Sequence, residues 1–163
     1  MTENGSRQGQ GGLWVSLLLS GIGVLISTYL SVKRFTGGSL ACSRWAQCDV
    51  VNNSLYAKIY GVPVAFIGLA GYLLLLGLSL AALETEGGTR RRLVALGLVL
   101  ALGGVAFSAY LTYIELYILE AVCSWCVASA TIITLVAVVG SVNLRRTAPG
   151  RAKASPASPA ARP

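Results

Sequence analysis

Four long stretches of the chain are apolar at nearly every position. They cover residues 13–32, 62–83, 93–114 and 122–142 and contain no Lys, Arg, Asp or Glu. An α-helix rises about 1.5 Å per residue, so roughly 20 residues cross the hydrocarbon layer of a bilayer. Apolar residues surround each predicted helix on all sides, which is typical of helices in lipid. We therefore predict an all-α integral membrane protein, with a bundle of four transmembrane helices over residues 13–144.

The polar segments at the two ends have the composition of disordered tails. Residues 1–12 are rich in glycine and glutamine, and residues 145–163 alternate Ala, Ser and Pro with basic residues. Such segments cannot bury a core, so we predict a disordered N-terminal tail and a disordered basic C-terminal tail. The first apolar stretch is too long for a signal peptide and lacks a basic start and a cleavage site, so we expect it to remain as a helix.

The segment of residues 33–61 is the longest polar loop between spans. Connections between neighbouring helices usually take about 2 to 8 residues, and longer loops are often functional. Ser54, after two asparagines, is typical of a turn or a helix N-cap. We predict a short surface helix over residues 55–60, ended by Gly61.

Composition and charge agree with a membrane protein. Hydrophobic residues make up 55% of the chain and charged residues 12%, against about 25% charged residues in soluble domains. Four spans put both tails and the loop of residues 84–92 on one side, with nine of the 13 basic residues. Because cytoplasmic segments are enriched in basic residues, we predict a cell-membrane protein with both termini cytoplasmic, and the basic surplus requires no nucleic acid. The nine residues are Arg7, Arg90, Arg91, Arg92, Arg145, Arg146, Arg151, Lys153 and Arg162.

The four cysteines form two pairs on the predicted extracytoplasmic side. Cys42 and Cys48 lie in the long loop, and Cys123 and Cys126 form a C-x-x-C at the start of the last span. This spacing is typical of redox dithiols, and a helix N-terminus favours the thiolate that disulfide exchange requires. A fixed pair at the membrane and a second pair on a loop that can move indicate an electron relay between thiols.

Other uses of the cysteines are possible on sequence grounds. Two structural disulfides would place them on the same oxidising side, but a C-x-x-C closes a tiny loop and so stabilises little through chain entropy. A four-cysteine zinc site fits poorly, because zinc ligands prefer a spacing of two to four residues. We therefore expect no metal.

The sequence lacks the residues of several other chemistries. It contains no histidine, which excludes histidine-ligated haem and the commonest general acid–base group. It also contains no Walker loop or dinucleotide fingerprint. Electrons from the thiols therefore need a separate acceptor, and a lipid-soluble quinone is the obvious diffusible acceptor in a membrane.

With these motifs in place, the sequence resembles the vitamin K epoxide reductase family in its bacterial branch. Order, spacing and placement on the predicted spans all match, over roughly residues 13–144. The resemblance rests on residues 42–51, 53–57, 60–63 and 123–126, read as CSRWAQCDVV, NSLYA, YGVP and CSWC.

The resemblance implies an enzyme, a disulfide/quinone oxidoreductase. Its helices would surround a quinone of the menaquinone, ubiquinone or phylloquinone type. It implies that Cys42 and Cys48 exchange with a separate thioredoxin-like (DsbA-type) protein outside the cytoplasm. Cys48 would pass electrons to Cys123, and Cys126 would reduce the quinone. Ser54 matches a family Ser/Thr near the relay and the quinone, and its alternative role is the helix cap.

The sequence departs from some relatives. Ala57 and Ala130 align with an Asn and a Tyr near the quinone head group of the vertebrate enzymes, so ordinary quinone reduction fits better than epoxide reduction. The DsbB-type oxidases also have four helices and two cysteine pairs, but there the C-x-x-C belongs to the first pair. Several bacterial members carry a fused thioredoxin-like domain; here only a predicted disordered tail follows the last span, so we expect a separate thiol partner.

The function predicted from the sequence is electron transfer from an extracytoplasmic dithiol to quinone, in support of disulfide formation in exported proteins. A membrane protein with stapling disulfides and a reductase running in the opposite direction are the alternatives. Glu115 and Glu120, near the outer end of the third span, could form a proton route to the reduced quinone or lie at the interface as solvated carboxylates.

Overall fold

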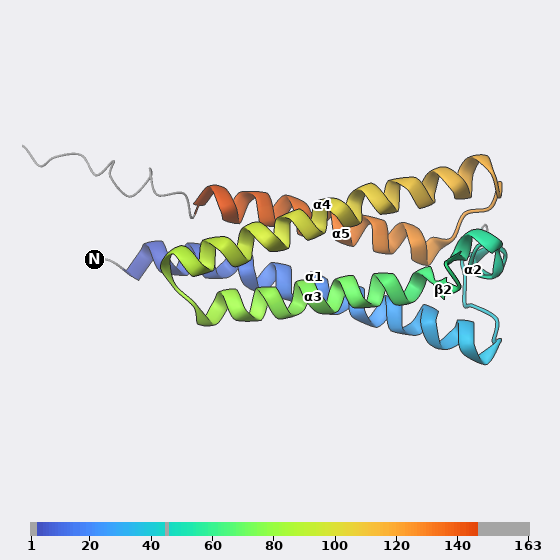
Figure 1. The fold of residues 1–163 in the computed structure, drawn as a ribbon, viewed down its shortest axis with the longest axis horizontal. Coiled ribbons are helices and arrows are strands. Elements are labelled where there is room, and N and C mark those ends of the chain that lie inside the picture. Colours follow the sequence, from blue (N-terminus) through green and yellow to red (C-terminus); the bar gives the residue numbers. More distant parts are fainter. Residues whose placement is uncertain (1–2, 45, 147–163) are drawn as a thin grey trace, which may run out of the picture.

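The structure is a computed structural model that describes residues 3–44 and 46–146. Four long helices dominate its fold (Figure 1). They are α1 (Glu3–Thr36), α3 (Val64–Glu84), α4 (Gly87–Tyr117) and α5 (Ser124–Arg146). Each contains a segment long and apolar enough to cross a membrane. The prediction of an all-α membrane bundle with four transmembrane helices is therefore confirmed.

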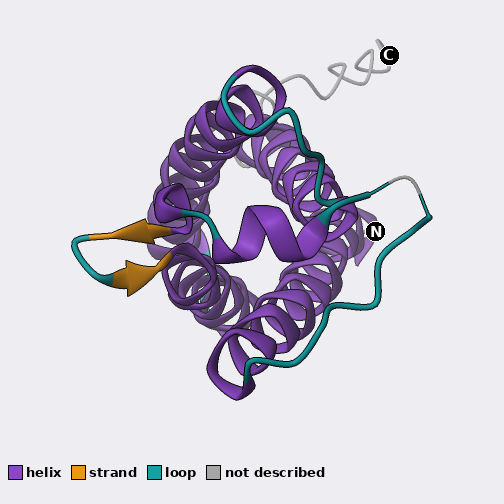
Figure 2. Cartoon of the chain, turned by 90° about the vertical axis from the view of Figure 1, so that its right-hand side faces the viewer, coloured by secondary structure: helices purple, strands orange, loops and turns teal. Residues whose placement is uncertain are grey.

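The four helices form a closed ring when the bundle is viewed from its end (Figure 2). α1 packs against α3 and α5, and α4 packs against the same two helices on the opposite side. α1 and α3 pack closely at Gly23, where a Cβ atom would overlap the ring of Tyr72. The Tyr72 hydroxyl donates to the carbonyl oxygen of Ser129 at 2.8 Å and so connects α3 to α5.

The loop between α1 and α3 contains four short elements. They are α2 (Cys48–Asn53), the 3-10 turn η1 (Leu55–Ala57), β1 (Lys58–Ile59) and β2 (Val62–Pro63). The two strands pair antiparallel, with Lys58 opposite Pro63. Figure 2 shows α2 lying across the end of the ring and the hairpin projecting to one side. The loop therefore caps one end of the bundle.

The predicted surface helix over residues 55–60 is wrong. Ser54 caps as expected, with its Oγ accepting from the backbone N–H of Ala57 at 3.2 Å, but the turn that it caps ends at Ala57. Residues 58–63 form the hairpin instead, because Gly61 has a φ of 84°, which suits a tight turn and not a helix. The true helix lies earlier, at residues 48–53.

The N-terminal segment also differs from its prediction. α1 begins at Glu3, whereas residues 1–12 were expected to be a disordered tail. Extending an existing helix adds one hydrogen bond per residue without the cost of a new nucleus, so a long apolar helix can continue into a polar segment. The predicted C-terminal tail falls outside the described residues from Thr147 onward.

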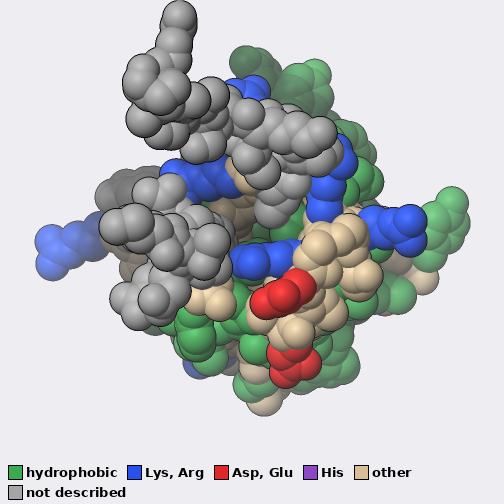
Figure 3. All heavy atoms as spheres, turned by 90° about the vertical axis from the view of Figure 1, so that its left-hand side faces the viewer, with side chains coloured by type: hydrophobic (Ala, Val, Ile, Leu, Met, Phe, Trp, Pro, Cys, Tyr) green, Lys and Arg blue, Asp and Glu red, His purple; other side chains and the backbone are tan. Residues whose placement is uncertain are grey.

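The two ends of the bundle differ in charge and in chemistry. Lysine and arginine side chains gather at the end shown in Figure 3. This end contains Arg90, Arg91 and Arg92 in the first turns of α4, and Arg145 and Arg146 in the last turn of α5. All four cysteines lie at the opposite end, in the capping loop and at the start of α5.

Candidate redox site

The loop cysteines form a disulfide at the start of α2. The bond joins Cys42 and Cys48, whose Cα atoms lie 6.2 Å apart. Cys48 is 1% exposed, whereas Cys42 is only half-buried. One sulfur of this pair therefore faces the interior of the protein, and the other is accessible from outside it.

The C-x-x-C pair carries two free thiols. Cys123 ends the loop before α5 and is fully buried, and Cys126 lies within the first turn of the helix. The backbone N–H of Cys126 points at Cys123 Sγ, at 3.4 Å. The pKa of Cys123 is lowered from its ordinary value, mainly because the Cys126 thiol donates a hydrogen bond to it, although burial acts in the other direction. This hydrogen bond favours the thiolate form of Cys123 over the thiol.

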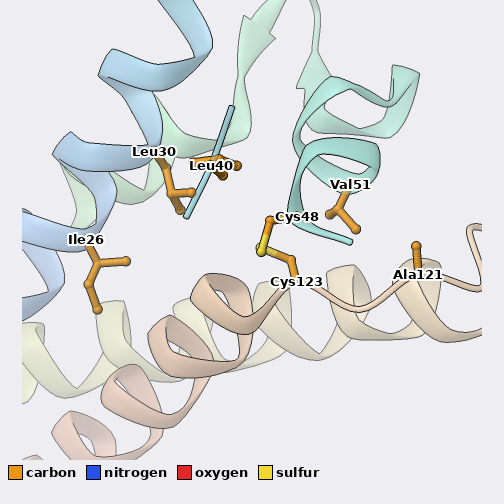
Figure 4. Close-up of a cluster of buried hydrophobic side chains, with 7 residues drawn as sticks. All are labelled: Ile26, Leu30, Leu40, Cys48, Val51, Ala121 and Cys123. Carbon is orange, nitrogen blue, oxygen red and sulfur yellow. The ribbon is translucent and has the colours of Figure 1, made fainter. Parts of the chain in front are cut away.

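The two pairs meet between α2 and the start of α5. Figure 4 shows the side chains of Cys48 and Cys123 pointing toward one another within a buried cluster. The Ser124 hydroxyl lies 3.5 Å from Cys48 Sγ and 3.8 Å from Cys42 Sγ. The structure thus brings together the loop pair and the C-x-x-C pair, which the sequence placed on the same side of the membrane.

Hydrogen bonds hold the loop against the C-x-x-C segment. The backbone N–H of Gln47 donates to the Val122 carbonyl at 2.9 Å, and the Trp125 indole N–H donates to the Ala41 carbonyl at 2.8 Å. The Trp125 ring also packs against Tyr29 of α1, with centroids 5.0 Å apart. A loop that can move was expected from the sequence, and in this structure the loop is docked against the C-x-x-C segment.

A cavity of about 690 Å³ lies inside the bundle beneath α2. Its volume is typical of small-molecule sites, which are mostly apolar with a few polar groups. All four long helices contribute residues to its wall. Examples are Leu75 of α3, Leu111 of α4 and Ile133 of α5. Of the four cysteines, only Cys126 lines it. The C-x-x-C pair therefore connects the buried sulfur of the loop to this cavity.

Ser54, Ala57 and Ala130, which the sequence pointed to, also line the cavity. Ser54 lines the cavity while its hydroxyl caps η1. The same side chain is therefore both the cap and a neighbour of the cavity, the two alternatives that the sequence left open. Ala57 and Ala130, the positions of the Asn and Tyr in the vertebrate enzymes, lie on the same wall. Alanine at these two positions offers no side-chain hydrogen-bond donor to the cavity.

The two glutamates near the cysteine end of the bundle, at the end of α4 and in the loop after it, have different surroundings. Glu120 is exposed, as expected for a carboxylate at the interface, whereas Glu115 is 4% exposed and lines the cavity. Glu115 Oε2 accepts from the backbone N–H of Cys123 at 3.1 Å, and the carboxylate is also hydrogen-bonded to the Cys126 thiol. The sequence showed both glutamates but gave no sign of which one reaches the cysteines.

The cavity wall is mainly apolar with a few polar groups. A lipid-soluble small molecule with polar atoms at one end would match it, because apolar side chains form most of the wall and Ser54, Glu115 and Cys126 add polar groups. Among residues 3–44 and 46–146, no group of three or more His, Cys, Asp or Glu side chains is placed to hold a metal ion.

The sequence was also compared with models of known protein families. Residues 14–140 match the model described as the vitamin K epoxide reductase family. The matched segment contains all four cysteines and every residue that lines the cavity. Members of this family are membrane thiol oxidoreductases that use quinones. Because the match covers most of the chain and includes the complete site, this multi-pass membrane protein belongs to the vitamin K epoxide reductase family.

Proposed function

We propose that this protein oxidises an extracytoplasmic thioredoxin-like (DsbA-type) protein and passes the electrons to a membrane quinone. The observation that carries the proposal is the order of the four cysteines from surface to cavity. Cys42 is half-buried, Cys48 and Cys123 are buried and face one another, and Cys126 lines the cavity. Electrons entering at the first sulfur can therefore reach the cavity by two thiol–disulfide exchanges.

The first exchange takes place at the loop pair. A thiolate of the partner attacks Cys42 Sγ, because this sulfur is the accessible one, and Cys48 leaves as a thiolate. A second thiolate of the partner then attacks the mixed disulfide and releases Cys42. The partner leaves with a disulfide, and the loop pair is reduced to two thiols.

The second exchange passes these electrons inward. Cys48 attacks Cys123 of an oxidised C-x-x-C pair, and Cys126 leaves as a thiolate into the cavity. Cys42 then attacks Cys48 and releases Cys123. This leaves a Cys42–Cys48 disulfide beside a free C-x-x-C dithiol, the arrangement that the structure shows.

A quinone bound in the cavity supplies the two-electron acceptor for the C-x-x-C dithiol. Ser54 and the apolar wall would hold its ring beside Cys126. Ala57 and Ala130 give that ring no side-chain hydrogen bond, which favours ordinary quinone reduction over opening of an epoxide. The expected biological result is disulfide formation in exported proteins.

The charge at the two ends supports an orientation. The basic end would face the cytoplasm with both termini, and the cysteine end would face outward. A membrane-impermeant maleimide applied to intact cells should label Cys42 after mild reduction. A cysteine introduced at Thr89, at the basic end, should react only after the membrane is opened. The reverse pattern would overturn the orientation.

The central experiment mixes the purified protein in lipid nanodiscs with a reduced thioredoxin-like protein and one of several quinones, and follows quinone absorbance. We expect catalytic quinone reduction together with one disulfide formed in the partner per quinone reduced. Starting instead from oxidised partner and quinol tests the opposite direction. A protein that reduces no quinone, or reduces it equally well without its cysteines, would contradict the proposal.

A further inference from the structure

Glu115 is the one carboxyl group on the cavity wall in the part of the chain that the structure describes. The other titratable side chains on the wall are Tyr56, Tyr72 and Cys126, and no lysine or arginine lines it. The Tyr72 hydroxyl is turned to Ser129, where it donates to the carbonyl oxygen. A carboxyl group placed among apolar side chains is costly to bury, and such groups usually have a functional reason.

The surroundings of Glu115 lead to the C-x-x-C pair. Glu115 Oε2 accepts from the Cys123 N–H at 3.1 Å, and Glu115 lines the cavity together with Cys126. Glu115 therefore lies beside the C-x-x-C pair and faces the space in which the electron acceptor would lie.

The proposed reaction needs a group that moves protons at this place. Oxidising a dithiol with a quinone transfers two electrons, and the quinol product carries two protons. Histidine, the commonest proton carrier in enzymes, is absent from the sequence. The acceptor would lie within the bundle, beneath the capping loop and among mainly apolar side chains.

We propose that Glu115 accepts the proton of the Cys126 thiol and delivers it to the reduced quinone. This inference rests on the proposed function. As Cys126 gives up its proton to the carboxylate, Cys123 enters as a thiolate. The two sulfurs lose two electrons to the quinone and form a disulfide. The carboxyl group then returns its proton to a quinol oxygen, and the second proton comes from water at the outer face.

Glu115→Gln separates this role from a structural one. Glutamine keeps a side-chain oxygen that can accept from the Cys123 N–H, so a purely structural role would survive the substitution. The glutamine amide cannot take up a proton, so a role in proton transfer would be lost. Glu120→Gln is the matched control, because Glu120 lies on the same segment but is exposed.

The first measurement is the rate of a single oxidation of the reduced C-x-x-C pair by quinone. We expect Glu115→Gln to slow it on the order of 100-fold, the lower range for a lost general acid–base group. Glu115→Asp should retain more of the rate, and Glu120→Gln should leave it unchanged. Equal rates in wild type and Glu115→Gln would overturn the inference and leave the proposed function intact, whereas no reduction by wild type would contradict the proposed function.

The second measurement needs no quinone. Infrared difference spectra, recorded as dithiothreitol reduces the C-x-x-C disulfide, report a carboxyl group that changes its protonation or hydrogen bonding. We expect a carboxyl band that Glu120→Gln retains and Glu115→Gln lacks. Identical spectra for wild type and Glu115→Gln would show that Glu115 exchanges no proton with the pair, and would overturn the inference whether or not a quinone is reduced.

Discussion

The two cysteine pairs are held by different kinds of structure. Cys123 and Cys126 sit at the beginning of a 23-residue helix, and Glu115 of the neighbouring helix is hydrogen-bonded to both. Cys42 and Cys48 sit on a connecting loop that contacts the bundle through separate hydrogen bonds, such as that from Trp125 to Ala41, and through buried side chains such as Leu40. Helix residues therefore surround the C-x-x-C pair, whereas the loop pair belongs to a segment that packs onto the end of the bundle.

This difference matches what each pair has to do in the proposed relay. A pair that reacts with a small molecule gains from a fixed geometry, because positioning lowers the barrier to reaction. A pair that reacts first with a protein and then with an internal thiol has to face two directions, and a loop at the end of a bundle can open and close more readily than a long helix. Substitutions should therefore affect the two pairs in different ways.

The largest effect is expected from Cys126→Ser. Cys126 is the one cysteine on the cavity wall, so its loss should reduce quinone turnover to background with either a protein thiol or dithiothreitol as donor. Val127→Ala, at the adjacent and exposed position, is the control and should keep normal turnover. Steady turnover of Cys126→Ser with any donor would mean that another sulfur reaches the quinone.

Cys42→Ser should remove one activity and leave the other. The protein donor would lose its point of entry, while dithiothreitol, which is small, should still reduce the C-x-x-C pair and support quinone turnover. Ser43→Ala, at an exposed neighbour, should keep both activities. If Cys42→Ser turned over the protein donor at the wild-type rate, the partner would have to enter through a different residue.

Trp125→Phe should have a smaller effect. It keeps a ring against Tyr29 but removes the hydrogen bond to Ala41, which is worth about 1 kcal/mol. The undocked loop should become about fivefold more populated. Amide hydrogen exchange of residues 38–47 measures this, and Trp14→Phe, in an exposed residue of α1, is the control. Unchanged exchange in Trp125→Phe would show that other contacts hold the loop.

The smallest effect concerns the ionisation of Cys123. Its pKa is lowered mainly by the hydrogen bond from Cys126, which stabilises the thiolate. Without the loop cysteines, in Cys42→Ser/Cys48→Ser, thiolate absorbance should therefore appear below the pH of an ordinary thiol. Adding Cys126→Ala should move this titration to higher pH. A shift to lower pH would mean that a different contact lowers the pKa of Cys123.

Sequence patterns predicted correctly the features that depend on a single segment of the chain. The lengths of the apolar stretches predicted the helices, and Ser54 predicted a cap that the structure contains. The helix within the long loop was placed wrongly, because its position depends on contacts with other segments. Cys48 begins that helix where it packs into a cluster with Cys123 and Ala121, which lie more than 70 positions further along the chain.

The sequence by itself determined the membrane bundle, the two cysteine pairs and the family, because each depends on residue type and spacing along the chain. The tertiary structure alone decided which sulfur is exposed, which faces its counterpart and which meets the cavity. It also distinguished Glu115 from Glu120, two carboxylates that look alike in the sequence. The reason is that burial and contact depend on how separate helices pack, and no local pattern records that packing.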